Sequence, residues 1–314
     1  MRLLPRFVPD DTHISFMRYR VLALSLSAAV TLLSVLLVAV FGLNFGIDFR
    51  GGTLIEVRTS EPADLARLRE ALGPLDLGEV QLQNFGGGRE VLIRFERQLE
   101  DERAQQSLVE EVKTTLQKHD PGIEIRRVEY VGPKVSQDLL RGGVLAVAIS
   151  VGLILVYIWF RFEWQFGVGA VVSLLHDVLV TVGAFAVVRY EFDLSTVAAL
   201  LTLVGYSLND TVVVYDRIRE NLRRYKTMPL EQIIDRSLND TLARTIMTGV
   251  TTLLALLALF FFGGEVIRGF TFAMIFGILV GTYSSVYIAS PILIYFNLRA
   301  VTPREEGAAA TARP

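Results

Sequence analysis

The sequence predicts an α-helical membrane protein with six transmembrane helices and one small α+β ferredoxin-like domain outside the membrane. Three observations predict this fold. Of the 314 residues, 52% are hydrophobic and only 20% are charged, and the mean hydropathy of +0.44 is higher than that of ordinary soluble proteins. Six long apolar runs divide the chain. One polar segment of about 100 residues separates the first run from the second.

The six apolar runs have the length of membrane spans. A bilayer core about 30 Å thick requires about 20 residues of helix. The runs cover residues 21–41, 141–160, 166–188, 194–214, 246–262 and 270–296. Arg18 and Arg20 precede the first run, as in a signal peptide, but the run is longer than a signal sequence needs and no A-x-A cleavage site follows it. The first run is therefore predicted to remain as a transmembrane helix.

Positive charges predict the orientation of these helices, because cytoplasmic loops are enriched in Lys and Arg. The basic residues on one side are Arg2, Arg6, Arg18, Arg20, Arg161, Arg217, Arg219, Arg223, Arg224, Lys226, Arg236, Arg299, Arg304 and Arg313. The opposite short loops contain only Arg189 and Arg268. The predicted cytoplasmic segments are the N-terminus 1–20, the loop 215–245 and the tail 297–314. Residues 42–140 then lie on the outer side of the membrane.

Residues 42–140 carry the pattern of a small ferredoxin-like domain. The alternating strands are TLIEVR, EVQLQNF, EVLIRFE and GIEIRRVEYV, and the amphipathic helices are PADLARLREAL and QQSLVEEVKTTLQKH. Glycines 86–88, between the second and third strands, predict a hairpin. The alternation of the last strand slips at Arg126 and Arg127, which predicts a β-bulge. The order β-α-β-β-α-β is that of a ferredoxin-like fold.

The composition excludes several classes of function. The absence of cysteine excludes disulfides and thiolate chemistry, and His13, His119 and His176 lack the spacing of a metal site. A net charge of -2 without a basic, aromatic-rich stretch argues against nucleic acid as a partner. No nucleophile stands beside a base, so neither enzyme activity nor a cofactor is predicted. An intramembrane hydrolase built on Ser207 or His176 is the least favoured alternative.

Polar residues recur along one face of the fourth and fifth apolar runs. Thr202, Tyr206 and Asp210 are spaced i, i+4, i+8, and Asn209 flanks them. The counterparts are Arg244, at the predicted cytoplasmic end of the fifth run, and Thr248, Thr251 and Thr252 within it. If the two helices are antiparallel neighbours, Asp210 and Arg244 lie at similar depth. An ionisable group within a span is costly unless it is paired, hydrated or neutralised, so Asp210 is the first candidate for a functional residue.

Simpler interpretations of the polar residues stay open. Asp210 also fits a helix cap or a structural ion pair with Arg244, and Arg244 alone fits a side chain that extends to the lipid headgroups. His176 and Asp177 form a second polar pair in the third run, where helix packing is favoured over a proton relay. In the sixth run, small residues recur every four positions, at Gly277, Gly281, Ser285 and Ala289. This spacing predicts close helix packing.

Four longer stretches carry a family resemblance. They are FGIDFRGGT (45–53), GYSLNDTVVVYDRIREN (205–221), LNDTLARTIMTGVTT (238–252) and GTYSSVYIA (281–289). They resemble signature stretches of the SecF family in the resistance-nodulation-division (RND) superfamily, the smaller membrane subunits of the SecD–SecF pair in bacterial protein export. The resemblance implies half of a twelve-span unit in the inner membrane, completed by SecD as a separate chain. It also implies preprotein substrates, and the SecYEG channel, the ATPase SecA and a YajC-like accessory subunit as partners.

The resemblance further implies that the proton motive force drives a late stage of preprotein translocation. It assigns Asp210 and Arg244 to the proton pathway, and the expectation extends to their neighbours Asn209, Tyr206 and Thr248. Two other functions stay open. One is a half-subunit of a proton-driven RND-type exporter of small molecules or lipids, although such exporters usually carry two large external domains in one chain. The other is a structural assembly factor without proton flux.

Overall fold

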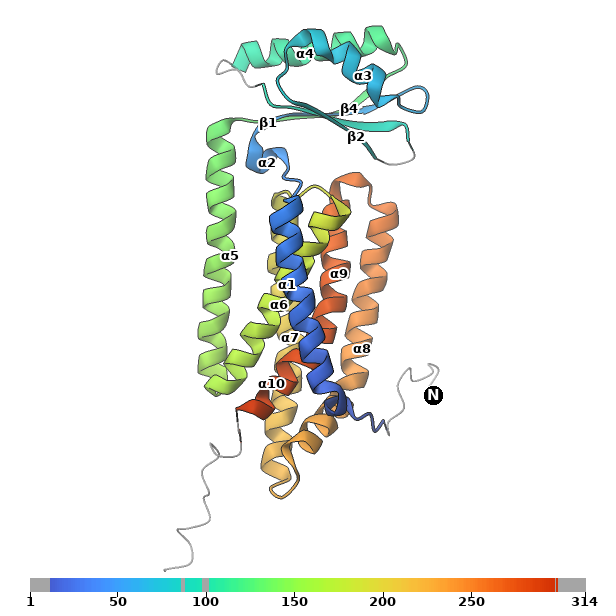
Figure 1. Cartoon of the computed structure of the whole chain (residues 1–314). Helices are drawn as coiled ribbons and strands as arrows, with labels where there is room; N and C mark the ends of the chain where they lie inside the picture. Colours follow the sequence, from blue (N-terminus) through green and yellow to red (C-terminus); the bar gives the residue numbers. More distant parts are fainter. Residues whose placement is uncertain (1–11, 86–87, 98–101, 297, 299–314) are drawn as a thin grey trace, which may run out of the picture.

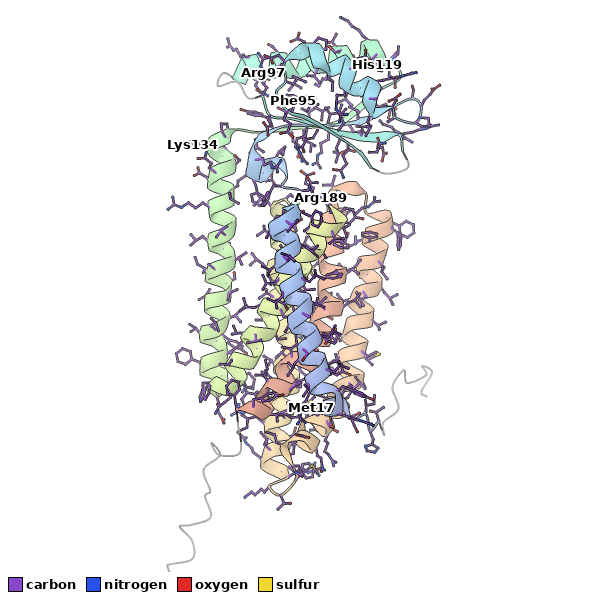
Figure 2. The ribbon with its side chains drawn as sticks, in the orientation of Figure 1. Met17, Phe95, Arg97, His119, Lys134 and Arg189 are labelled. Carbon is purple, nitrogen blue, oxygen red and sulfur yellow. The ribbon has the colours of Figure 1, made fainter. Side chains whose placement is uncertain are left out.

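A computed structural model of the chain describes residues 12–85, 88–97, 102–296 and 298. The protein has two parts, a bundle of long helices and a small α+β domain at one end of that bundle (Figure 1). Figure 2 shows Arg189 at the end of the bundle that faces the domain and Met17 at the opposite end. The predicted tail 297–314, apart from Leu298, and the first eleven residues of the N-terminal segment lie outside the described residues.

Six spans in the described part of the chain are long and apolar enough to cross a membrane, which confirms the predicted fold class. Their helices are α1 (Arg20–Phe41), α5 (Pro133–Arg161), α6 (Trp164–Val188), α7 (Leu194–Arg224), α8 (Leu230–Phe262) and α9 (Arg268–Ser284). A π-helical turn (Ser285–Ala289) continues α9 into α10 (Ser290–Tyr295). The last span therefore consists of two α-helical pieces joined by a π turn.

Two of these helices extend well beyond the apolar runs into the predicted loop 215–245. Helix α7 continues to Arg224 and α8 starts at Leu230, so only a short turn separates them. Polar contacts hold the two extensions together. Arg217 Nε donates to Asp240 Oδ2 at 2.8 Å, and Asn221 Nδ2 donates to Ser237 Oγ at 2.9 Å. The loop is a paired helical hairpin in which these polar contacts surround buried apolar side chains, among them Ile218 and Ile234.

The α+β domain has the predicted element order. Its elements are β1 (Gly52–Arg58), α3 (Leu65–Leu72), β2 (Val80–Phe85), β3 (Glu90–Phe95), α4 (Glu102–His119) and β4 (Glu124–Val131). The strands form an antiparallel sheet in the order β2-β3-β1-β4. Helices α3 and α4 cover the face of the sheet that is turned away from the bundle (Figure 1). This is the β-α-β-β-α-β arrangement of a ferredoxin-like fold.

The local signals in the domain sequence have clear structural counterparts. The β1–β4 register shifts between Glu56, opposite Arg127, and Val57, opposite Ile125, which confirms the predicted bulge. Strands β2 and β3 pair from Phe85 and Glu90 onward, as the predicted hairpin requires. The core between sheet and helices is apolar; its members include Ile55, Val57, Leu68, Leu72, Val112 and Leu116. A core of this size suits a small domain without disulfides.

Two consecutive glycines connect the membrane bundle to the sheet. The short helix α2 (Ile47–Arg50) follows α1 and ends at Gly51, which has a φ of 75°. Gly52, the first residue of β1, has a φ of 112°, and a Cβ there would lie 2.6 Å from the carbonyl oxygen of Phe95. Only glycine combines this backbone conformation with such a close approach. The glycine pair therefore permits the sharp turn from helix into the central strand.

A buried ion pair joins the sheet to the loop between α6 and α7. Arg94 of β3 is 9% exposed, and its Nη2 lies 2.8 Å from Glu191 Oε1. Burial raises the pKa of Glu191, whereas Arg94 favours its ionised form. Beside this pair, the Gly46 amide donates to the Phe192 carbonyl at 3.0 Å. The domain is thus attached to the adjacent end of the bundle by backbone and charged contacts together.

Arg94→Gln is expected to loosen this attachment. The variant removes the nearest cation from Glu191, a largely buried carboxylate beside Asp193 and Asp48, and leaves only the weaker influence of Arg127. Removing one partner of a buried pair costs about 3 kcal/mol. We expect a lower melting temperature in detergent and faster hydrogen exchange at the Gly46 amide. Arg126→Gln is the matched control, since its ion pair with Glu124 is largely exposed and its loss costs less than about 0.5 kcal/mol. Equal melting temperatures for both variants would contradict a supporting role of Arg94.

Candidate functional site

Three helices converge on the carboxylate of Asp210. Asp210 lies on α7, half-buried within the bundle. Its Oδ1 accepts a hydrogen bond from Thr245 Oγ1 of α8 at 2.6 Å. Its Oδ2 accepts one from Ser285 Oγ at 2.7 Å, at the start of the π-helical turn. Each carboxylate oxygen therefore has one hydroxyl donor from a different helix, so Asp210 connects α7 to α8 and to the last span.

A hydroxyl-rich cavity of about 140 Å³ adjoins Asp210. The residues that line it are Tyr206, Asn209 and Asp210 of α7, Thr245, Thr248, Thr251 and Thr252 of α8, and Thr282 of α9. All of these side chains can form hydrogen bonds with water, and the volume is large enough for several water molecules. The cavity can therefore hydrate the carboxylate and deliver a proton to it inside a span.

The predicted site residues differ in their relation to this cavity. Tyr206, Asn209 and Thr248 line it together with Asp210. Arg244 does not: its side chain is exposed, and no ion pair with Asp210 forms among the described residues. The carbonyl of Arg244 accepts a hydrogen bond from Thr248 Oγ1 at 2.9 Å. The structure thus brings four of the five residues together and leaves the guanidinium apart from the carboxylate.

Two hydroxyl donors to Asp210 were not assigned to the site from the sequence. Thr245 directly follows Arg244, and its spacing of four from Thr241 places both threonines on one face of α8. That spacing was the available signal. Ser285 was assigned to helix packing because it belongs to the small-residue pattern of the last span. Its hydroxyl donates to Asp210. The small-residue spacing alone gave no indication of this hydrogen bond.

The small residues of α9 lie against α7. A Cβ on Gly277 would come within 2.4 Å of Leu203 Cδ2, and a Cβ on Gly281 would lie 3.1 Å from Ser207 Cβ. These glycines let the two helix backbones approach closely. The close approach is what allows a short serine side chain at the next turn, Ser285, to reach a carboxylate on the neighbouring helix.

A second carboxylate occupies the middle of the bundle. Asp177 of α6 is 1% exposed. Its Oδ2 accepts hydrogen bonds from Ser207 Oγ at 2.6 Å and from Ser284 Oγ at 2.8 Å, while its Oδ1 lies 3.0 Å from His176 Nδ1. The pair is therefore the centre of a polar network that includes α6, α7 and α9.

Comparisons with known proteins connect these features to a family. Residues 111–299 match the family description "Protein export membrane protein SecD/SecF, C-terminal", and residues 36–63 match the SecD/SecF GG motif. The chain is 48% identical over 305 residues to protein translocase subunit SecF of Rhodobacter capsulatus, which covers 93% of this chain and 92% of that protein. The chain belongs to the SecF family. SecF of Rickettsia bellii is 46% identical over 298 residues, with 94% and 98% coverage.

Solved structures of SecDF have the same fold as this SecF-family chain. A crystal structure of SecDF from Thermus thermophilus, described as a translocon-associated membrane protein, matches with a TM-score of 0.83 and 35% identity. SecDF in a super-membrane-facing form matches with a TM-score of 0.67 and 38% identity. In both cases the match covers 94% of this chain and 40% of the SecDF chain. The chain therefore spans about 40% of the length of the SecDF proteins it matches.

The matched segments contain all four stretches that resemble the SecF family. FGIDFRGGT lies within the match to the GG motif, and its two glycines are those that turn the chain from α2 into β1. The other three stretches lie within the C-terminal match and supply Asp210, Thr245 and Ser285. The family stretches are thus also the parts of the chain that build the carboxylate site.

Proposed function

We propose that this SecF-family subunit acts with SecD to use the proton motive force in completing preprotein export across the inner membrane. The observation that carries the proposal is the carboxylate of Asp210, held by hydroxyls of two other helices beside a polar cavity within a membrane span. Protonation there replaces a charged group by a neutral one. Moving one elementary charge across the membrane is worth about 2.3 kcal/mol per 100 mV.

The contacts of Asp210 suggest how protonation changes the helix packing. The ionised carboxylate accepts from both Thr245 and Ser285. A protonated carboxyl group has one O–H donor of its own, so one of these hydroxyls loses its acceptor or must turn. Ser285 opens the π-helical turn of the last span, and π turns are common at functional sites. We propose that the last span adjusts at this turn as Asp210 gains and loses its proton.

An exposed polar stripe supports a partner within the membrane. Thr202 and Asn209 of α7 and Arg244, Thr248 and Thr251 of α8 are exposed on the isolated chain although they belong to spans. Polar groups in hydrocarbon are costly unless another protein or water covers them. We propose that SecD covers this stripe and completes the proton pathway, with Arg244 contributing at that interface. The resemblance supports SecYEG, SecA and a YajC-like subunit as further components.

The proposed orientation places both termini and the α7–α8 hairpin in the cytoplasm and the α+β domain in the periplasm. The asymmetry of Lys and Arg between the two ends of the spans supports it. An impermeant thiol reagent applied to cells with a permeable outer membrane should then label Ser107→Cys and leave Met228→Cys unlabelled. Labelling of the second variant from outside would reverse the orientation.

Proton flux tests the proposed function directly. Vesicles that contain this chain, SecD and the SecYEG channel, with the cytoplasmic side facing outward and an acidic interior, should lose protons faster while SecA drives a preprotein into them than without it. A pH-sensitive dye enclosed in the vesicles measures the flux. A preprotein that is exported at the same rate with and without a proton gradient would contradict the proposal and favour a structural assembly role.

A further inference from the structure

The His176–Asp177 pair is buried without a permanent positive charge. Among the described residues, the side-chain partners of Asp177 are the hydroxyls of Ser207 and Ser284 and the imidazole of His176. A carboxylate in the middle of a membrane bundle is costly to ionise unless a positive charge balances it. One proton shared by the imidazole and the carboxylate makes the pair neutral overall. Ser207 and Ser284 both donate to Asp177 Oδ2, and His176 Nδ1 lies 3.0 Å from Asp177 Oδ1, close enough for one proton to be held between the two side chains.

Two neighbouring serines link this pair to Asp210. Ser284 donates to Asp177, and Ser285 donates to Asp210 at 2.7 Å. Successive side chains of a helix point about 100° apart. At the end of α9, Ser284 therefore points towards α6, and the next residue, Ser285, points towards α7. Ser173 Oγ also donates to Ser284 Oγ at 2.9 Å. The two serines are consecutive residues, so the hydroxyl donors of Asp177 and Asp210 come from one turn of the last span.

Within the described part of the chain, the other helices around the pair contribute no further permanent charge. From α9, the ring of Tyr283 lies 6.4 Å from that of His176. The Tyr283 hydroxyl is 3.0 Å from Ser27 Oγ of α1. Helix α5 presents aliphatic side chains towards α6, including Val147 and Val151. On α7, Ser207 contacts Asp177, while the titratable Tyr206 and Asp210 line the polar cavity. Asp210 is therefore the charged group that the serines connect to the pair.

We propose that the His176–Asp177 pair is a second proton-binding site of this bundle, coupled to Asp210 through Ser284 and Ser285. The inference rests on the proposed function, in which Asp210 exchanges protons. A proton added to Asp210 removes a negative charge that favours a proton on the pair, so the pair releases one proton as Asp210 gains one. Only O–H and N–H bonds change, and the two sites together hold one proton. Alternating occupancy of this kind requires a coupling free energy between the sites.

Nuclear magnetic resonance of His176 tests the site without measuring transport. The chain has three histidines, so His13→Gln combined with His119→Gln leaves His176 as the one labelled imidazole in the ¹⁵N-histidine-labelled full chain. In lipid nanodiscs, His176 should be doubly protonated at low pH and lose one proton between about pH 5 and pH 9. Asp177→Asn should keep it singly protonated throughout. A single, unchanging protonation state in the parent chain would overturn the proposal.

The coupling is tested at a fixed pH where both forms of His176 coexist. Asp210→Asn should lower the ratio of doubly to singly protonated His176 by about fivefold or more. The same substitution should have a smaller effect in a Ser285→Ala background, because the serine link is then broken and only the Coulomb interaction through space is left. Thr245→Ala is the matched control. It removes the other hydroxyl donor of Asp210, which comes from α8 and not from the serine link. In this background the effect of Asp210→Asn on the ratio should keep its full size.

Two outcomes would overturn the coupling. In one, the ratio does not respond to Asp210→Asn; in the other, the response has the same size in the Ser285→Ala background as in the parent chain. If Ser285→Ala does not fold, Ser284→Ala breaks the same link and Asp210→Asn should again have a smaller effect in that background. If the protonation ratio of His176 does not respond to Asp210→Asn while proton-driven export depends on Asp210, this inference alone is contradicted. If the protonation ratio of His176 responds to Asp210→Asn but export does not depend on the proton gradient, the proposed function alone is contradicted.

Discussion

Asp210→Asn is expected to abolish the proton-dependent stimulation of export while the protein still folds, inserts and binds its partner. Asparagine has the size of aspartate but cannot ionise, so the site is held permanently neutral. Its oxygen accepts from one of the two hydroxyls, and the other hydroxyl must turn to accept from the amide. We expect a loss of about 1 kcal/mol in stability. Export by vesicles with and without a proton gradient measures the effect.

Asp216→Asn is the matched control for this variant. Asp216 lies on the same helix, but it is partly exposed and pairs with Arg161 at 3.0 Å beyond the apolar part of the span. An exposed ion pair contributes little, so export should keep its dependence on the gradient. If Asp216→Asn lost that dependence to the same extent, the effect of Asp210→Asn would reflect charge on α7 in general.

Arg244→Leu separates the carrier role of Asp210 from a structural ion pair. If the two side chains formed a structural ion pair, Asp210→Asn would leave Arg244 unpaired and lower the abundance of the protein. Adding Arg244→Leu would then restore the abundance. The two side chains form no ion pair within the described residues, so we expect no such rescue. Restored abundance together with restored proton-driven export in the double variant would refute the carrier role. Restored or undiminished abundance without proton coupling would leave the carrier role standing.

Gly183→Ala is expected to separate α1 from α6. A Cβ on Gly183 would lie 2.4 Å from Ser34 Cβ and 2.8 Å from Ser34 Cα. The second contact is with the backbone, so a side-chain rotation cannot relieve it and α1 must move. Overpacking of this kind costs about 1–3 kcal/mol. We expect a lower melting temperature in detergent. We also expect a lower yield of disulfide crosslinks between cysteines introduced into α1 and α6.

Gly152→Ala on α5 is the control for this packing effect. A Cβ at Gly152 has no heavy atom within 4 Å, and alanine has a higher helix propensity than glycine. The melting temperature should therefore stay equal or rise. If Gly183→Ala and Gly152→Ala had the same melting temperature, the close approach of α1 and α6 would not contribute to stability.

The sequence by itself determined the features that depend on local pattern. Six apolar runs correspond to six membrane helices because hydropathy over about 20 residues reflects the thickness of the bilayer. The alternation of apolar residues specified the strands of the external domain, and its interruption at Arg126 and Arg127 specified the bulge in β4. The i, i+4 spacing on α7 was sufficient to put Tyr206 and Asp210 on one face, and both line the same cavity.

Only the tertiary structure decided which side chains meet across helices. Helical spacing defines a face, but the rotation and height of one helix against another depend on the packing of the whole bundle. This is why Ser285, a member of a small-residue pattern, turned out to donate to Asp210, and why Arg244 lies apart from it. Gly183 and the Arg94–Glu191 pair have no local signal, because their partners are more than 90 residues away in the sequence.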